Sequence, residues 1–247
     1  GGLFAVVAHK ILGLFRSSPS MLETRGRLMV RHLCRHLDPR RLYATVARAI
    51  QAETDLVFAQ QLVQTFSWIL LTSVETRGLR EELLVKVPLA ELGDAPTPPG
   101  STAAPPGGTA AAAAAPLFFE LLEPWFHNPV SALALCLWAQ QYELATDLMA
   151  RFAEFEPTLD LLKQLDQLVH LLESPIFSRL RLQLLEPQEH PALLKCLLRL
   201  AMLLPQARAF GILRERIQVV QSGLLLEAQL GGEPPHGGEE GPGAEEP

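Results

Sequence analysis

Apolar residues recur three and four positions apart along most of the chain, which is the spacing of an amphipathic α-helix. Between residues 20 and 37 this spacing produces one apolar stripe, made of Leu22, Met29, Leu33 and Leu37. Ser20 and Glu23 match a capping box, in which each side chain bonds a free backbone amide of the first helical turn. We therefore expect a helix that begins at Ser20.

Prolines indicate where the other helices begin and end. Asp38 and Asn128 each precede a proline, which pairs a capping side chain with a first helical position that needs no N–H. The same punctuation predicts helices over residues 39–50, 54–72, 76–87, 130–139, 142–155, 158–172, 175–185, 191–204 and 206–220. No segment alternates apolar and polar residues as a series of strands does.

Short helices joined by tight turns are typical of stacked helical hairpins. We predict an all-α chain that folds as a HEAT-like α-solenoid. The intervals between successive helix pairs are irregular, so a compact helical bundle stays open as an alternative.

Composition divides the chain into four parts. Residues 88–116 hold seven prolines and four glycines, which predicts a disordered linker. Residues 222–247 end in a stretch rich in Gly and Glu, which predicts an acidic, disordered tail. We expect the helical blocks 1–87 and 117–221 to belong to one domain.

The distribution of charges and cysteines indicates where the protein is found and what it contacts. The net charge is −6, yet residues 1–50 carry nine Lys and Arg side chains against two acidic ones. This asymmetry indicates that the basic end docks to a partner. The 3 cysteines are widely spaced and odd in number, which favours a reducing compartment over a disulfide framework. One long charge-free segment, residues 56–74, contains several Gln, Thr and Ser residues, and the other, residues 124–142, contains Pro129 beside His127 and Asn128. We therefore expect no membrane span and only indirect membrane contact.

The sequence predicts a protein that is not an enzyme and needs no cofactor or metal. It contains no Gly-rich phosphate loop and no H-E-x-x-H motif. His32 and His36 stand four apart, but Cys34 between them points elsewhere and no acidic residue nearby supplies a third ligand. We interpret both histidines as side chains that border the apolar stripe.

Three arginines, Arg27, Arg31 and Arg35, recur four apart and are expected on the solvent face of their helix. Such a stripe is either a plain solvated face or a docking surface for an acidic protein, a lipid headgroup or nucleic acid. Few aromatic residues accompany it, so we do not expect nucleic-acid binding.

Two further groups of residues are candidates for an assembly interface. Trp125, His127 and Asn128 lie just before a helix cap, where large aromatics either anchor the core or form an interface centre. Arg179, Arg181 and Gln183 lie in a leucine-rich helix, and the arginines are either interface residues or inter-repeat salt-bridge donors.

Several segments resemble, in the same order, the C-terminal region of the vacuole morphology scaffold family ("Vac fourteen"). These segments are residues 22–26, 69–73, 125–130, 171–177, 180–187 and 203–206. Together the similarity covers most of residues 11–220. The segment 88–116 and the acidic tail depart from the family pattern. Family members also carry a long N-terminal series of HEAT repeats, so we expect this chain to be a fragment.

The resemblance implies a scaffold without catalytic activity. Members of the family bind PIKfyve, the lipid kinase that makes phosphatidylinositol 3,5-bisphosphate, and the Sac-domain phosphatase that reverses this step. Their C-terminal part self-associates. The resemblance therefore implies a homo-oligomer on the cytosolic face of endosomal, lysosomal or vacuolar membranes. A generic HEAT-like adaptor, in transport or associated with nucleic acid, is the alternative function.

Overall fold

The computed structural model describes residues 2–84, 117–152, 154 and 158–230. The predicted linker at 88–116 and residues 231–247 of the predicted tail lie outside the described residues. Every regular element in the described ranges is helical, as predicted.

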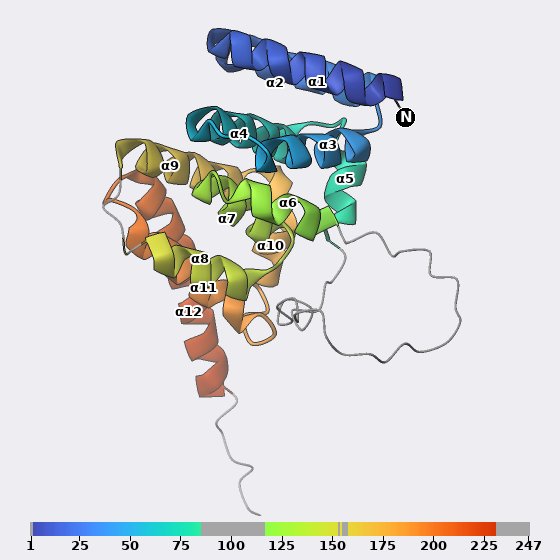
Figure 1. The fold of residues 1–247 in the computed structure, drawn as a ribbon. Helices are drawn as coiled ribbons and strands as arrows, with labels where there is room; N and C mark the ends of the chain where they lie inside the picture. Colours follow the sequence, from blue (N-terminus) through green and yellow to red (C-terminus); the bar gives the residue numbers. More distant parts are fainter. Residues whose placement is uncertain (1, 85–116, 153, 155–157, 231–247) are drawn as a thin grey trace, which may run out of the picture.

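The helices follow one another with short connections (Figure 1). They are α1 (Gly2–Ser17), α2 (Pro19–His36), α3 (Pro39–Gln51), α4 (Leu56–Thr72), α5 (Arg77–Glu82), α6 (Leu117–Trp125), α7 (Pro129–Trp138), α8 (Tyr142–Phe152), α9 (Leu159–Glu173), the 3-10 helix η2 (Pro175–Phe177), α10 (Ser178–Gln183), α11 (Pro191–Leu203) and α12 (Arg208–Leu230).

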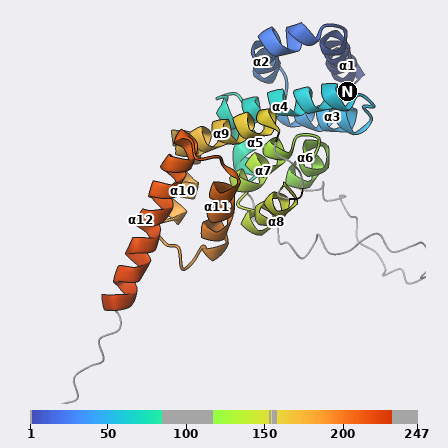
Figure 2. The same ribbon diagram turned by 90° about the vertical axis from the view of Figure 1, so that its left-hand side faces the viewer.

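The helices stack as hairpins in two rows. In one row, α1 contacts α3, α3 contacts α6, and α8 contacts α11. The other row runs through α2, α4, α7, α9 and α12, each in contact with the next. Figure 2 shows the resulting elongated stack, from α1 and α2 at one end to α12 at the other. This arrangement confirms the predicted all-α solenoid.

One continuous apolar core runs through the stack. Near its middle, Trp125 and Tyr43 have no exposed surface, and their ring centroids are 6.3 Å apart. The Tyr43 hydroxyl donates a hydrogen bond of 2.9 Å to the backbone oxygen of Phe66, so its polar atom is satisfied inside the core. These contacts tie α3, α4 and α6 together.

The local signals for helix starts were partly right. Asp38 caps α3 by accepting from the Arg40 amide, and Asn128 caps α7 by accepting from the Ser131 amide at 2.9 Å, as predicted. The capping box at Ser20 was wrong, because α2 already begins at Pro19. A proline at the first helical position favours this earlier start.

Several helix bounds also differ from the prediction, two of them by several residues. Helix α5 ends at Glu82, whereas the sequence predicted a helix over residues 76–87. Helix α12 continues to Leu230, so the boundary expected at residue 221 lies inside a helix. A single glycine costs a helix only about 1 kcal/mol, and the good helix formers around Gly223 outweigh it.

Candidate binding surfaces

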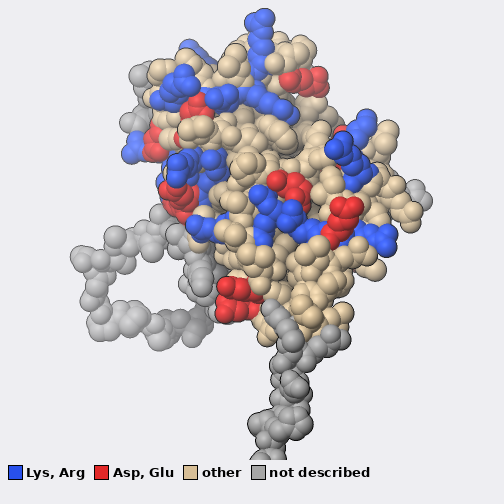
Figure 3. Space-filling model, turned by 180° about the vertical axis from the view of Figure 1, so that it is seen from behind, with Lys and Arg blue, Asp and Glu red and all other residues tan. Residues whose placement is uncertain are grey.

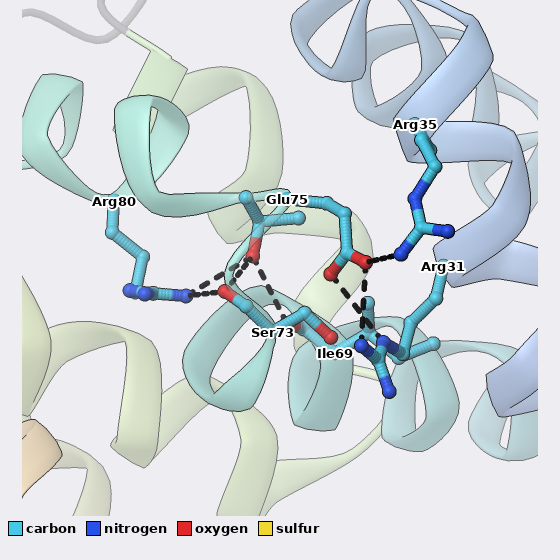
Figure 4. Close-up of polar contacts among 7 residues, drawn as sticks. Arg31, Arg35, Ile69, Ser73, Glu75 and Arg80 are labelled. Atoms are coloured by element: carbon cyan, nitrogen blue, oxygen red, sulfur yellow. Dashed lines mark hydrogen bonds and ion pairs between the residues drawn. The ribbon is translucent and has the colours of Figure 1, made fainter.

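The arginines of α2 face the turn between α4 and α5 and are not freely solvated. Arg31 and Arg35 both contact the carboxylate of Glu75, at 3.2 and 3.0 Å (Figure 4). The two arginine side chains are 47% and 63% exposed, whereas Glu75 is only 11% exposed. The outer sides of both guanidinium groups therefore stay open to solvent while their inner sides hold α2 against the turn.

This pairing changes the acidity of Glu75. Its own backbone N–H donates to the carboxylate, and Arg31 and then Arg35 add side-chain hydrogen bonds that outweigh desolvation. Together they lower the pKa of Glu75 from 4.5 to about 2. The carboxylate is thus ionised at any pH near neutrality.

The third arginine of the stripe, Arg27, is held differently. Its guanidinium carbon lies 4.9 Å from the centre of the Trp68 ring on α4, which is the geometry of a cation–π contact. All three predicted docking arginines thus have partners within the chain. A polyanion would have to compete with Glu75 and Trp68 for them.

The residues before α7 lie mostly inside the protein. Trp125 and Asn128 are fully buried, so neither presents a surface to a partner in this structure. His127 is half-buried and its Nδ1–H donates to the Pro124 oxygen at 2.9 Å. The exposed aromatic at this place is Phe126, which is 45% exposed.

Asn128 instead joins α7 to α9. Besides capping α7, it donates from Nδ2 to the side-chain oxygen of Gln164 at 2.9 Å. Gln164 in turn donates to Asp160 at 2.6 Å. This partly buried network fixes side chains that border a groove described below.

The three candidates on α10 have different roles. Arg179 is exposed. Arg181 turns inward and donates from Nη1 to the backbone oxygens of Leu172 and Ser174 at the end of α9. Gln183 accepts a hydrogen bond from the Tyr142 hydroxyl on α8. Of the three, only Arg179 has its side chain free for a partner.

Sequence reasoning missed two apolar residues next to Arg179. Leu182 and Leu185 are 63% and 73% exposed, whereas Leu180 and Leu184 are buried. A leucine-rich run does not by itself tell which leucines face out. The signal that separates them is the helical spacing of four between Leu180 and Leu184, which leaves Leu182 on the opposite face.

Apolar exposure continues on the last two helices. Met202 of α11 is 87% exposed, and Val219, Leu225 and Leu226 of α12 are between 58% and 73% exposed. Figure 3 shows the charged side chains gathered on the upper and middle parts of one face, while the lower part carries few. We call the exposed residues Leu182, Leu185, Met202, Val219, Leu225 and Leu226 the C-terminal apolar surface.

A groove with both polar and apolar lining lies among α2, α4, α7, α8 and α9. Three adjoining hollows share their lining residues: Gln64 belongs to the first and second, Gln60 and Asp160 to the second and third, and Gln164 to the first and third. The two larger hollows measure about 420 and 240 Å³. We call this continuous depression the glutamine groove.

Within the described ranges, the potential metal ligands form no cluster and the cysteines are buried. No group of three His, Cys, Asp or Glu side chains there converges as metal ligands. Burial raises the pKa of the Cys34, Cys136 and Cys196 thiols to about 12. Helices that combine the length and the apolar character of a bilayer span are absent from residues 2–84, 117–152 and 158–230.

The family described as "Vacuolar protein 14 C-terminal Fig4p binding" matches residues 19–220. The match begins at the first residue of α2 and ends inside α12, so it takes in nearly the whole helical stack. This chain belongs to that family. The resemblance found in the sequence is confirmed.

Curated relatives of the Vacuolar protein 14 family agree. The chain is 36% identical over 208 residues to "Protein VAC14 homolog" of Schizosaccharomyces pombe and 40% identical over 207 residues to the protein of that name from Arabidopsis thaliana. It is 35% identical over 208 residues to "Vacuole morphology and inheritance protein 14" of Saccharomyces cerevisiae. The three matches cover 83% to 84% of this chain but only 21% to 25% of the relatives. No solved structure matches the chain.

Proposed function

We propose that this chain is a binding module without catalytic activity that holds a Sac-domain phosphoinositide phosphatase of the Fig4p type. One observation carries the proposal: the family described by Fig4p binding matches nearly the whole helical stack, residues 19–220, and not a short motif. A binding function that extends over most of the stack fits a solenoid, whose surface is built by successive hairpins.

The C-terminal apolar surface supports this proposal. Exposed leucines next to an unpaired arginine, such as Leu182, Leu185 and Arg179, have the composition of an interface core with a polar rim. Exposed apolar residues also lie on α11 and α12, which contact each other, and large exposed apolar areas are typical of protein-binding sites. We assign the phosphatase to this surface.

The proposal also covers assembly of this chain with a lipid kinase and with other copies of itself. We infer that the chain also binds a PIKfyve-type lipid kinase and self-associates on the cytosolic face of endosomal, lysosomal or vacuolar membranes. Holding the kinase and the phosphatase on one oligomer would raise the effective concentration of each enzyme near the other. The scaffold would thereby regulate both the synthesis and the turnover of phosphatidylinositol 3,5-bisphosphate.

Capture of the purified phosphatase by the immobilised chain tests the proposal. We expect Leu182→Glu with Leu185→Glu to lower capture at least tenfold, because two charges then enter the apolar contact. Leu28→Glu is the matched control, since Leu28 on α2 is 70% exposed. The proposal fails if the unaltered chain captures no phosphatase.

Self-association is tested separately by light scattering of the purified chain. We expect a mass above that of one chain. A strict monomer would remove self-association from the proposal and leave phosphatase binding standing.

A further inference from the structure

The glutamine groove contains amide side chains with no partner of their own. Gln60 and Gln64 on α4 and Gln167 on α9 make no side-chain hydrogen bond to any residue that the structure describes. Gln60 and Gln64 are half-buried. Each amide offers two donors and an acceptor, so three sets of hydrogen-bonding groups line the groove unused.

The spacing of these amides matches an extended polypeptide. Gln60 and Gln64 stand one turn apart on α4, which is about 6 Å along the helix axis. In an extended chain, every second residue recurs after about 6.6 to 6.8 Å. A side-chain amide presents a C=O beside an N–H, so two such amides can bond alternate peptide groups of a strand laid along α4.

The charges of the groove indicate which side chains such a strand carries. Glu23 and Asp160 line the largest hollow, and neither forms an ion pair with a described cation. Glu23 accepts from Gln61 and Asp160 accepts from Gln164. Arg27 also lines the hollow, but it lies over the Trp68 ring. Lysine or arginine side chains would neutralise the two carboxylates.

Apolar residues complete the lining. Val57 on α4 is 65% exposed at the largest hollow, and Phe152 and Leu161 line the hollow beside it. At the other side, Trp68 and Leu71 border the smallest hollow together with Gln167. The largest hollow, at about 420 Å³, has the size of ordinary ligand sites.

From these contacts we propose that the glutamine groove binds an extended segment of a partner protein that alternates basic and apolar residues. The amides of Gln60 and Gln64 hold its backbone, Glu23 and Asp160 hold its cations, and the apolar lining takes the alternate side chains. This site is separate from the C-terminal apolar surface and does not depend on the phosphatase assignment.

Fluorescence anisotropy of the whole chain with labelled decapeptides tests the proposal. The probes are a peptide of alternating lysine and valine, the same peptide with aspartate for lysine, and a lysine–valine peptide with alternate backbone amides methylated. We expect saturable binding of the first and at least tenfold weaker binding of the other two, because they lack the cations or the backbone donors.

Variants then locate the binding. Gln60→Ala with Gln64→Ala is expected to weaken the lysine–valine peptide about tenfold, through loss of the amide contacts. Gln218→Ala with Gln221→Ala is the matched control, because both residues are exposed on α12. Circular dichroism is expected to be unchanged, since Gln60 and Gln64 bond nothing within the described stack.

Three results would overturn the proposal: no saturable binding of the lysine–valine peptide, equal binding of the methylated peptide, or unchanged binding by the Gln60→Ala, Gln64→Ala variant. The variant with Leu182→Glu and Leu185→Glu is expected to bind this peptide normally. Failure of the groove is therefore distinguishable from failure of phosphatase capture.

Discussion

Arg80 and Arg181 each donate hydrogen bonds to two backbone oxygens at a helix end, in two distant parts of the stack. Arg80 donates from Nη1 to the backbone oxygens of Leu70 and Ser73 at the end of α4. Arg181 does the same for Leu172 and Ser174 at the end of α9. Each arginine satisfies carbonyl groups that a helix end leaves without partners, and its charge suits the negative end of the helix dipole.

The sequence around the two arginines repeats as well. Residues 70–84 and 171–185 align without gaps, with identical residues at Leu70 and Leu171, Leu71 and Leu172, Ser73 and Ser174, Leu79 and Leu180, Arg80 and Arg181, Leu83 and Leu184, and Leu84 and Leu185. Buried leucines recur at the same places of α5 and α10. The stack therefore contains two copies of one sequence and structural motif, a helix end held by an arginine of the next short helix.

Removing either arginine is expected to destabilise the protein. Arg80→Ala and Arg181→Ala each remove a charged donor from two carbonyl oxygens at a helix end, which costs about 1–3 kcal/mol. The Thr76 hydroxyl still contacts the Leu70 and Ser73 oxygens, and the Phe177 amide still donates to the Ser174 oxygen. Arg80→Ala is expected to cost more, because Arg80 also lies over Trp138. Urea denaturation followed by circular dichroism measures both. Arg179→Ala is the control and should change stability little, since Arg179 is exposed. Equal effects of Arg181→Ala and Arg179→Ala would contradict the capping role.

Stability is expected to depend on pH through Glu75. Its pKa is 4.5 in the unfolded chain and about 2 in the folded protein, so folding favours the ionised form. The contribution is fully present above pH 4.5 and is lost as the pH falls toward 2. Glu75→Gln should remove this part of the pH dependence. Urea midpoints of both proteins between pH 2 and 7 provide the measurement, and parallel curves would contradict the assignment. Added salt should weaken the contribution, because Arg31 and Arg35 are partly exposed.

Asn128 is expected to contribute through two separate contacts. Asn128→Ala removes the cap of α7 and leaves the Gln164 side-chain oxygen without its donor, at a total cost of roughly 2–4 kcal/mol. Asn128→Ser keeps a capping oxygen and loses only the contact to Gln164, so it should lose about half as much. Denaturant melts of the two variants measure the difference. If both lose the same stability, the cap contributes nothing.

The three cysteines are expected to be unreactive in the folded protein. Cys34, Cys136 and Cys196 are buried, and burial raises the pKa of each thiol to about 12. Both effects suppress the reactive thiolate. A thiol reagent such as a disulfide dye should label them only as fast as the protein opens, and should label all three in denaturant. Rapid labelling of one cysteine at pH 7 without loss of helix would contradict this burial.

The fold was predictable because its signals are local. The helix caps and the helical spacing of leucines each depend on residues within one or two turns. The structure confirms the caps at Asp38 and Asn128. The candidate site was not predictable from the sequence, because tertiary contacts decide which of its side chains are exposed. Nothing near Arg31 in the sequence indicates that Glu75 will pair with it. Trp125 and Asn128 were chosen for their chemistry, and only the packing of α3, α4 and α9 around them decides that they are buried.

Hydrogen–deuterium exchange of the whole chain, with and without the purified Sac-domain phosphatase, tests the central claim most directly. The account predicts that the phosphatase slows exchange in peptides from α10, α11 and α12, where the C-terminal apolar surface lies. Peptides from α1 and α2 should exchange at the same rate in both samples. Unchanged exchange throughout α10–α12 at saturating phosphatase would contradict the claim that this surface of the helical stack holds it.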